Sequence, residues 1–445
     1  MKISKTLLFQ GRQYDFLSDN TQDLDERTLF VNTPRNQKFL PQVLQEWGAS
    51  LEFKELIHHF KIPEKIIGIT GTNGKTTTAN LIYSSLKFLG KNIAMLGTQG
   101  LFYNGKQLKP KGLTTPGILE LYEDLESLVQ IGCEILVMEV SSHAIDQKRI
   151  YGLEFCAKIL TQITSDHLDY HKSIEEYIRV KNSFFDDDCL KIINQDEKKA
   201  IYNSHHSYTY GFDERSDLSV KNFSFKQGIS ADLCLKINDF KQELKLLSPL
   251  YGKHNLSNLM AAFLCVEVLF GKDIKVREQI FTTSQILESF WHFSGVSGRM
   301  EVISQDPLVI VDFAHTHDGM QKIFESFEDR DIVVVFGAGG DRDKTKRPLM
   351  GEVASRFAKK IFITSDNPRT ENPLSIIDDI VSGIKDKHKI TIEPDRKKAI
   401  QDALKSLKRD EVLLILGKGD ETYQILKDKT IEFDDRVIVR EMLFC

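Results

Sequence analysis

The segment GTNGKTTT, residues 71–78, has the residue types of a loop that holds phosphate groups. Glycines let the backbone wrap closely round phosphate oxygens, and the free N–H groups at a helix start attract anions. Lys75 would bring positive charge to the outer phosphates, and the Thr76 hydroxyl could bind Mg²⁺. Ile69 stands where the generic P-loop has its first glycine, so this is a shorter variant. The predicted phosphate-binding residues are Gly71, Thr72, Asn73, Gly74, Lys75, Thr76 and Thr77.

A phosphate loop by itself is compatible with switch GTPases, small-molecule kinases and ATP-driven ligases. The sequence contains no N-K-x-D motif of the kind that reads guanine. The choice between the remaining classes depends on the polar residues that follow the other strands.

Two candidate metal ligands follow apolar strand patterns. Glu139 ends the run 134–140, where a buried carboxylate is costly unless it meets a cation. We interpret it as a magnesium ligand, with a helix-capping acid as the alternative. His167 can offer a neutral nitrogen to a metal, oriented by Asp166 and Asp169, although a lone loop histidine is more often hydrogen-bonded at the surface. Its place after a strand parallel to that of Glu139 favours the metal.

The elements that must position these residues follow an α/β pattern from Lys65 onward. Strands are predicted at 65–70, 134–140 and 157–163, and a helix from Lys75 to Leu89 that Gly90 ends. Residues 206–247 alternate apolar and polar side chains, which predicts a small antiparallel insertion or an added sheet.

A second alternation begins near Met300, with strands predicted at 307–313, 331–337, 360–365 and 411–417. This pattern is typical of a doubly wound sheet, whose ligands lie at the carboxyl ends of the strands. Residues 1–62 are the least regular, with one short strand at 29–32.

Length and composition limit the class of protein. At roughly 150 residues per domain, 445 residues suggest about three domains. A hydrophobic fraction of 41% and a net charge of -5 are typical of a soluble globular protein without broad attraction to nucleic acid. No apolar run reaches the ~18 residues of a membrane span, and the N-terminus lacks a secretory signal, so we expect a cytoplasmic protein. We also expect a monomer. Six scattered cysteines predict neither disulfides nor a zinc site.

Nine motifs carry a family resemblance over about residues 65–445. They occur in the order GTNGKTTT, MEVSSHA, TSDHLDYH, YGKHNLSNLMAA, SGRME, VDFAHT, FGAGGDRDKTKRP, SDNPR and GKGDETYQ. Together they resemble the Mur ligases of bacterial cell-wall synthesis, and most closely their MurE branch. We therefore predict an α/β protein with a small N-terminal domain for the UDP substrate (1–62), a central P-loop-type parallel-sheet domain for ATP (63–297) and a C-terminal Rossmann-like domain for the amino acid (298–445).

The resemblance implies an ATP-dependent amide ligase that adds meso-diaminopimelate to UDP-N-acetylmuramoyl-L-alanyl-D-glutamate during peptidoglycan precursor synthesis. A carboxylate is a poor acyl donor, and phosphorylation by ATP converts one of its oxygens into a leaving group. The amine of the third amino acid then displaces phosphate. Cations must bring the two anionic reactants together, and the family uses two Mg²⁺ ions for this.

The same resemblance assigns the catalytic and ATP-binding residues. Thr76 would bind the first Mg²⁺, whereas Glu139 and His167 would bind the second. Lys181 would carry a carbamate formed from CO₂, because an ammonium 4 Å from a divalent ion would be repelled by roughly 8 kcal/mol at an effective dielectric constant of 20. Without the neighbouring motif, Lys181 would be taken for a solvated helix lysine. Lys75 would neutralise charge on the transferring oxygens. Contacts to ATP are assigned to Asn258, Arg299 and Asp312, the last two reaching it when the domains close.

The substrate-binding residues come from the same comparison of motifs. For the UDP-linked dipeptide they are Thr21, Thr114, Thr115, Ser141, Gln147 and Arg149. For diaminopimelate they are Arg342, Asp366, Asn367, Pro368, Arg369, Gly417 and Glu421. Arg369 would pair with the second carboxylate, which lysine lacks, and a charged hydrogen bond of ~1.5–3 kcal/mol would discriminate on the order of 10- to 150-fold. The alternative for Arg369 is a surface arginine.

Several positions depart from the family pattern. Gln162, Leu113, His317 and Asp420 replace the usual residues, and residues 1–62 keep little beyond Thr21 and the strand at 29–32. Two other functions stay open: a folylpolyglutamate or cyanophycin synthetase, which share the phosphate loop, and a nucleotide-binding scaffold or switch without ligase activity.

Overall fold

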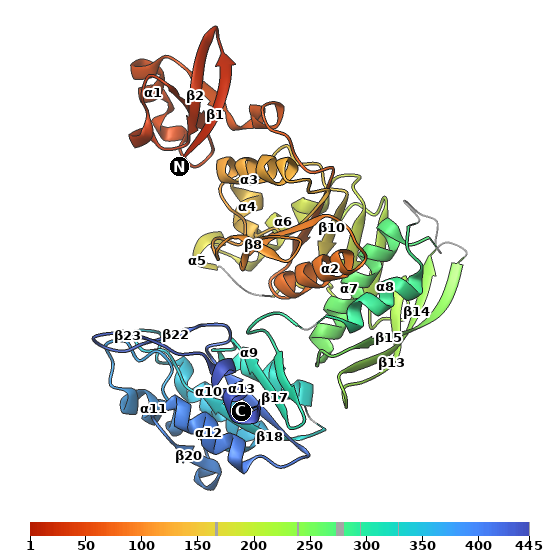
Figure 1. The fold of residues 1–445 in the computed structure, drawn as a ribbon, viewed down its shortest axis with the longest axis vertical. Helices are drawn as coiled ribbons and strands as arrows, with labels where there is room; N and C mark the ends of the chain where they lie inside the picture. Colours follow the sequence, from red (N-terminus) through yellow and green to blue (C-terminus); the bar gives the residue numbers. More distant parts are fainter. Residues whose placement is uncertain (165–167, 238–239, 273–279, 294, 328, 445) are drawn as a thin grey trace. The chain divides into compact units, whose positions relative to one another are not determined.

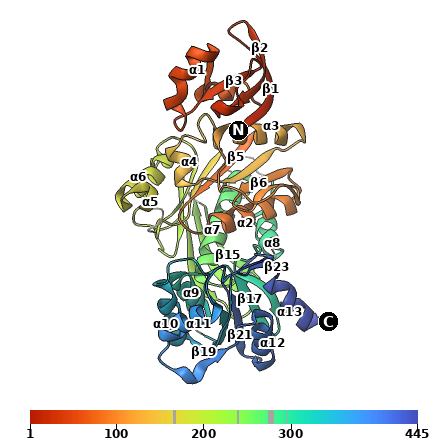
Figure 2. The same cartoon turned by 90° about the vertical axis from the view of Figure 1, so that its left-hand side faces the viewer.

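The computed structural model describes residues 1–164, 168–237, 240–272, 280–293, 295–327 and 329–444 (Figures 1 and 2). Its chain forms two compact units. The first comprises Met1–Asn222, Asp232–Lys245 and Ser257–Phe290, and the second comprises Phe223–Ala231, Leu246–Leu256 and Trp291–Cys445. The predicted α/β class is confirmed, and the domain boundaries at 62/63 and 297/298 stay a prediction.

Residues 1–62 contain more regular structure than the sequence pattern predicted. Four strands pair in the order β1-β2-β3-β4, namely β1 (Lys2–Phe9), β2 (Arg12–Ser18), β3 (Thr28–Asn32) and β4 (Ser50–Glu52), with helix α1 (Leu40–Trp47) between the last two. Only β3 was predicted. The turn between β1 and β2 places Gln10 and Gly11 at φ of 50° and 80°, the two positive values that a tight hairpin of this kind needs. A Gln-Gly pair is a weaker hairpin signal than Asn-Gly, so the hairpin was missed.

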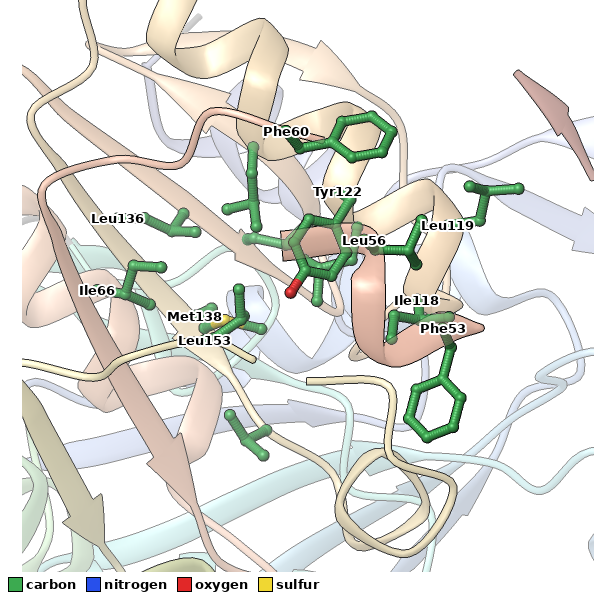
Figure 3. Close-up of a cluster of buried hydrophobic side chains, with 14 of the residues drawn as sticks. Phe53, Leu56, Phe60, Ile66, Ile118, Leu119, Tyr122, Leu136, Met138 and Leu153 are labelled. Atoms are coloured by element: carbon green, nitrogen blue, oxygen red, sulfur yellow. The ribbon is translucent and has the colours of Figure 1, made fainter. Parts of the chain in front are cut away.

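This N-terminal sheet is anchored on helix α3 (Ile118–Gln130) by a shared apolar core (Figure 3). Phe53, Leu56 and Phe60 pack with Leu119 and Tyr122 of the helix. An ion pair of 2.7 Å between Lys5 and Glu126 closes the edge. Because α3 leads directly into strand β9 (Ile135–Glu139), this core also holds the strand that carries Glu139.

The central sheet of the first unit has the order β15-β14-β13-β12-β11-β10-β5-β9-β6-β7-β8. Its middle strands are β5 (Lys65–Thr70), β10 (Ala157–Leu160), β11 (Lys191–Asn194) and β6 (Ile93–Gly97), joined at the edge by β7 (Gly100–Tyr103) and β8 (Lys106–Lys109). Strand β5 pairs in parallel with both β9 and β10, so that Ile69 lies opposite Glu139 and Thr70 opposite Leu160. The strands predicted at 65–70, 134–140 and 157–163 are thus confirmed, and their carboxyl ends meet at one edge.

Helices surround this sheet. They are α2 (Lys75–Phe88), α4 (Ser142–Asp146), α5 (Leu168–His171), α6 (Ile174–Asn182), α7 (Lys253–Phe270) and α8 (Thr283–Trp291). Helix α2 begins directly after the phosphate loop, as predicted, and ends one residue early.

The segment 206–247 extends the central sheet. It forms β12 (Ser207–Gly211), β13 (Leu218–Ser224), β14 (Ile229–Ile237) and β15 (Phe240–Ser248). The pairs β11–β12 and β12–β13 are parallel, so the predicted antiparallel arrangement is wrong for them. Alternation of apolar residues shows which face is buried and leaves the direction of pairing open.

The second unit contains a doubly wound sheet of order β16-β17-β21-β18-β19-β20. Its strands are β16 (Glu301–Gln305), β17 (Leu308–Asp312), β18 (Asp331–Phe336), β19 (Ala358–Ile363), β20 (Ile390–Ile392) and β21 (Glu411–Leu416), followed by the hairpin β22 (Tyr423–Ile425) and β23 (Thr430–Glu432). The helices are α9 (His317–Phe324), α10 (Lys346–Phe357), α11 (Pro373–Ser382), α12 (Arg396–Ser406) and α13 (Asp435–Phe444). All four predicted strands are confirmed.

Successive residues of these strands pack into two separate hydrophobic cores. Val333, Val335 and Leu413 pack in the core that contains α12 and α13, whereas Val334 and Leu414 pack in the core of α9, α10 and α11. Because both faces of the sheet are buried, its strands are continuous apolar runs in the sequence. Strands of a sheet with one solvent-exposed face would alternate apolar and polar residues.

Two further expectations concern cysteines and membranes. Cys133, Cys156, Cys189, Cys234 and Cys265 are not joined by disulfide bonds, and Cys445 lies outside the described residues. No helix in the described part of the chain is long and apolar enough to cross a membrane.

A buried ion pair between α12 and α13 supports a prediction on stability. Arg396 donates to both carboxylate oxygens of Asp435, at 2.8 and 2.7 Å, and to the Leu416 carbonyl oxygen at 3.0 Å, and both charged side chains are fully buried. We expect R396M to lower the free energy of unfolding of the second unit by about 3–5 kcal/mol, because the Asp435 charge stays buried without its partner. Urea denaturation at pH 7 measures this loss.

The control is the exposed pair Lys397–Glu441, at 3.6 Å on the same two helices, for which K397A should cost at most ~1 kcal/mol. A double variant, R396M with D435L, should recover most of the loss, since apolar groups can replace a buried pair. Equal losses in R396M and K397A would contradict the prediction.

Candidate active site

The phosphate loop between β5 and α2 is packed on both sides. A side chain at Gly71, where φ is 151°, would overlap the Thr161 hydroxyl, and one at Gly74, where φ is 87°, would overlap the Asn258 side-chain oxygen. The Thr161 hydroxyl donates to the Asn73 carbonyl oxygen at 2.6 Å. The loop therefore needs glycine at these two positions, and it already touches the predicted adenine contact.

The backbone of Gln162 also holds this loop. Its carbonyl oxygen accepts from the Thr72 N–H at 2.6 Å. This contact does not use the side chain, so an amide one methylene longer than the family asparagine leaves it intact.

Two lysines converge on a single carbonyl oxygen of the loop. Lys75 donates to the Gly71 oxygen at 2.8 Å, and Lys181, from α6, donates to the same oxygen at 2.9 Å. The two ammonium nitrogens therefore lie no more than about 6 Å apart. Lys181 is almost fully buried. Lys75 and Lys181, which are 106 positions apart in the sequence, thus share one atom of the site.

Glu139 is a buried carboxylate at the end of β9, as predicted. Its two oxygens accept from the Thr76 hydroxyl at 2.9 Å and from the Thr98 N–H at 3.0 Å. Burial raises the pKa of Glu139, and the positive charge of Lys75 opposes that rise. The two predicted metal ligands Thr76 and Glu139 are therefore in direct contact.

The donor set fits Mg²⁺. A hydroxyl and a buried carboxylate are oxygen ligands of the kind this ion prefers, and a cation here would offset the cost of burying Glu139. His167 lies outside the described residues, so its role as a metal ligand stays a prediction. Among the described residues, no three or more His, Cys, Asp or Glu side chains cluster as a metal site.

Five residues assigned to the UDP-linked substrate lie beside Glu139, and Thr115 connects them. The Thr115 hydroxyl donates to the Glu139 carbonyl oxygen at 2.9 Å and accepts from the Ser141 N–H at 3.0 Å. Its own carbonyl oxygen accepts from Arg149 at 2.7 Å. The neighbouring Thr114 hydroxyl lies 3.1 Å from that of Thr98. Thr21, by contrast, is in a short 3-10 helix, Thr21–Asp23, and no hydrogen bond among the described residues joins it to this group.

Gln147 and Arg149 are held by a residue that the sequence reasoning missed. The Gln147 side-chain oxygen accepts from Arg149 at 3.1 and 2.7 Å, while its amide nitrogen donates to the Tyr170 hydroxyl at 3.0 Å. Tyr170 in turn donates to Asp146 at 2.6 Å. Tyr170 stands three positions after His167 in the same motif, so the motif could have pointed to it. Burial lowers the pKa of Arg149, and the charge of Arg35 adds to this effect.

Thr98 was also missed, although it directly follows strand β6 at the edge where ligands are expected. It contacts both Glu139 and Thr114.

In the second unit, Asp312 ends β17 and is buried. Its carboxylate accepts from the backbone N–H groups of Met300 and Ala314, each at 2.7 Å, and burial raises its pKa against the opposing charge of Arg299. Arg299 lies over the Phe313 ring, 5.0 Å from its centre. The two residues assigned to ATP thus lie close together within this unit.

The residues assigned to diaminopimelate gather after β18, β19 and β21. The Asn367 amide donates to Glu421 at 2.9 Å, and Lys418 donates to Glu421 at 3.0 Å and to the Asn367 oxygen at 3.3 Å. A side chain at Gly417, where φ is 114°, would overlap Asp366. Lys418 is fully buried and was not predicted.

Arg369 follows Pro368 in a left-handed backbone conformation, with φ of 52°. Its guanidinium donates to the Gly340 carbonyl oxygen at 2.7 Å. Gly339 has both Arg369 and Arg342 next to it, so the two arginines border one stretch of backbone. Glu421, with a smaller effect of Asp420, raises the pKa of Tyr423 beside this group.

Comparison with known proteins identifies the family. The family model of the Mur ligase middle domain matches residues 69–266. The family model of the Mur ligase glutamate ligase domain matches residues 298–419. A UDP-N-acetylmuramoyl-L-alanyl-D-glutamate--2,6-diaminopimelate ligase of Helicobacter pylori is 52% identical over 99% of this chain and 98% of its own length. The chain belongs to the Mur ligase family.

Two other relatives agree with this assignment. The ligase of the same description from Wolinella succinogenes is 50% identical over 97% of this chain and 96% of its own length. A solved structure of an enzyme so described superposes with a TM-score of 0.72 at 26% identity, over 96% of this chain and 94% of that one. In this Mur ligase, the matched middle domain contains the phosphate loop, Glu139 and Lys181, and the matched glutamate ligase domain contains Asp312 and Arg369.

The contact between Thr76 and Glu139 leads to a prediction about Mg²⁺. We expect E139Q to raise the Mg²⁺ concentration that gives half-maximal phosphate release by about tenfold or more, since even changes next to metal ligands cost roughly 10- to 100-fold in affinity. Glutamine retains an oxygen for the Thr98 N–H, so the fold should persist. Mg²⁺ titrations of activity, and of the thermal shift with ATP, measure the effect.

The matched control is E134Q, the same change at an exposed position just before β9. It should leave the Mg²⁺ requirement unchanged. An unaltered requirement in E139Q would remove Glu139 from the metal site.

Proposed function

We propose that this protein is an ATP-dependent amide ligase that adds meso-diaminopimelate to UDP-N-acetylmuramoyl-L-alanyl-D-glutamate, a cytoplasmic step of peptidoglycan precursor synthesis. The main support is the convergence of the phosphate loop, Glu139 and Lys181 at one edge of the central sheet. Relatives of about 50% identity over nearly the whole chain have this activity in their names.

The reaction needs an activated carboxyl group. An oxygen of the dipeptide carboxylate attacks the γ-phosphorus of ATP, ADP leaves, and an acyl phosphate forms. The amine of diaminopimelate then attacks the acyl carbon, and the nitrogen gives up one proton. The tetrahedral intermediate collapses, and phosphate departs with the bond electrons. Both reactants of the first step are anions, so positive charge must be supplied before they can approach.

The residues at the sheet edge supply and organise this charge. Lys75 and the N–H groups at the start of α2 bind the triphosphate. Thr76, Glu139, His167 and a carbamate on Lys181 would hold two Mg²⁺ ions, which neutralise charge on the transferring oxygens when bound. The group around Thr115 and Arg149 places the carboxylate of the UDP-linked dipeptide beside Glu139.

The position of Lys181 supports the carbamate. Two ammonium groups no more than about 6 Å apart repel each other by at least roughly 3 kcal/mol at an effective dielectric constant of 20. Reaction of the neutral Lys181 amine with CO₂ forms an N–C bond and releases a proton, leaving an anionic carbamate. The repulsion from Lys75 becomes attraction, and the site gains an oxygen ligand.

Arg299 and Asp312 belong to the second unit, whereas the phosphate loop belongs to the first. We propose that the units meet around ATP during turnover, which would shield the acyl phosphate from water.

One assay tests the proposed function. Purified protein with ATP, Mg²⁺ and UDP-N-acetylmuramoyl-L-alanyl-D-glutamate should release phosphate rapidly with meso-diaminopimelate, weakly with lysine and negligibly without an amino acid. A folylpolyglutamate synthetase would instead respond to a folate and glutamate. ATP binding without any substrate-dependent phosphate release would favour a scaffold and contradict the proposal.

A second variant tests the carbamate. We expect K181A to lower kcat by about 100-fold or more, and short-chain carboxylic acids to restore part of it by supplying the missing carboxylate. The control is R179A on the same helix, whose exposed guanidinium pairs with Glu176 at 2.6 Å. R179A should keep full activity and show no response to added acid. Full activity in K181A would exclude the carbamate from the mechanism.

A further inference from the structure

We propose that Lys427 binds the distal carboxylate of the amino-acid substrate together with Arg369, and that this pair of cations selects diaminopimelate over lysine. The inference rests on the proposed function and adds a specificity residue to it. It arises from a cavity in the second unit that both side chains line.

The cavity has a volume of about 410 Å³, within the range of small-molecule sites. It lies between the loop that follows β19 and the turn that joins β22 to β23. The residues that matter to the argument are Pro368, Arg369, Glu371, Pro373, Leu426 and Lys427.

Backbone hydrogen bonds hold the two walls of this cavity together. The Arg369 N–H donates to the Ile425 carbonyl oxygen at 3.2 Å, and the Ile425 N–H donates to the Asn367 side-chain oxygen at 2.9 Å. The Leu426 N–H donates to the Lys429 carbonyl oxygen at 2.8 Å, which closes the turn. The backbone of the turn that carries the exposed Lys427 therefore has a set position relative to Arg369, although the two residues are 58 positions apart in the sequence.

The charges around the cavity favour an anion. Glu371 is the one carboxylate among the lining residues, and Arg347 binds both of its oxygens at 3.0 and 2.8 Å, with Lys344 at 3.1 Å. The Arg347 guanidinium is the main reason that the pKa of Glu371 falls to about 2. Glu371 is thus ionised and its charge is compensated.

Other carboxylates nearby are also engaged or turned to solvent. Asp341 accepts from the Thr370 hydroxyl at 2.6 Å, and Asp428 is exposed in the turn. Within the described part of the chain, Lys427 forms no ion pair. Arg369 and Lys427 are therefore the two cations among the residues that line the cavity.

The charged groups in and beside the cavity are complementary to the distal end of diaminopimelate. Its distal carbon carries an ammonium and a carboxylate, and Glu421, held by Lys418 and Asn367, is suited to the ammonium. The carboxylate would lie between Arg369 and Lys427, and apolar Pro368, Pro373 and Leu426 would face the methylene chain. Lysine has no distal carboxylate, so only its ammonium group would approach Arg369 and Lys427, and these would repel it.

The test compares two lysines of the same turn. K427M should raise the KM for diaminopimelate about tenfold, near the lower end of the effect of one charged hydrogen bond, and leave the KM for ATP unchanged. The preference for diaminopimelate over lysine, measured as a ratio of kcat/KM values, should fall by a similar factor. K429M removes the same charge from an exposed residue that does not line the cavity, and it should have no effect.

A double variant tests whether the two cations act on one group. If Arg369 and Lys427 share the carboxylate, K427M should cost much less in an R369A background than in the natural protein. Unchanged kinetics of K427M, equal effects of K427M and K429M, or a parallel rise in the KM for ATP would each overturn the inference. In all these cases the natural protein still ligates diaminopimelate, whereas a natural protein that fails to do so would remove the proposed function as well.

Discussion

The central constraint in this protein is the placement of like charges in one buried corner. Parallel pairing of β5 with β9 and β10 brings the phosphate loop, Glu139 and the Thr161 segment to the same edge of the sheet. Helix α6 then adds Lys181 to the carbonyl oxygen that Lys75 already contacts. Burying one carboxylate and two lysines costs free energy when each charge is alone. Contacts among these groups, and with bound phosphate and metal, offset that cost.

Around this corner, hydrogen bonds fix the residues that are assigned to the substrate. Thr115 links Glu139 to Ser141 and Arg149 through backbone contacts. Tyr170 holds the amide of Gln147, which leaves the Gln147 oxygen for Arg149. A network in which each polar group has a defined partner keeps the substrate-facing groups in one orientation, which preorganised catalysis requires.

In the second unit, buried ion pairs fix the loops that carry the assigned residues. Arg347 ties Glu371 in place behind Arg369, Lys418 holds Glu421 beside Asn367, and Arg396 supports the Leu416 carbonyl just before Gly417. Each pair lies directly behind a loop at the carboxyl end of a strand. The loops can therefore be polar and exposed while their conformations stay determined by the buried charges beneath them.

Sequence alone determined the local chemistry and the strands that lead into the candidate sites, whereas strands such as β1, β2, β6 and β11 were not predicted. The phosphate loop, Glu139 and the four strands of the second unit follow from short-range patterns, because glycine geometry and runs of buried apolar residues are visible within a few positions. The tertiary structure decided which distant residues come together: Lys75 and Lys181 at one carbonyl oxygen, Glu139 with Thr98, and Arg369 and Lys427 in the lining of one cavity. It also decided the direction of pairing in β12 and β13 and revealed the first hairpin. These features depend on contacts between residues far apart in the chain, whose energies no local pattern records.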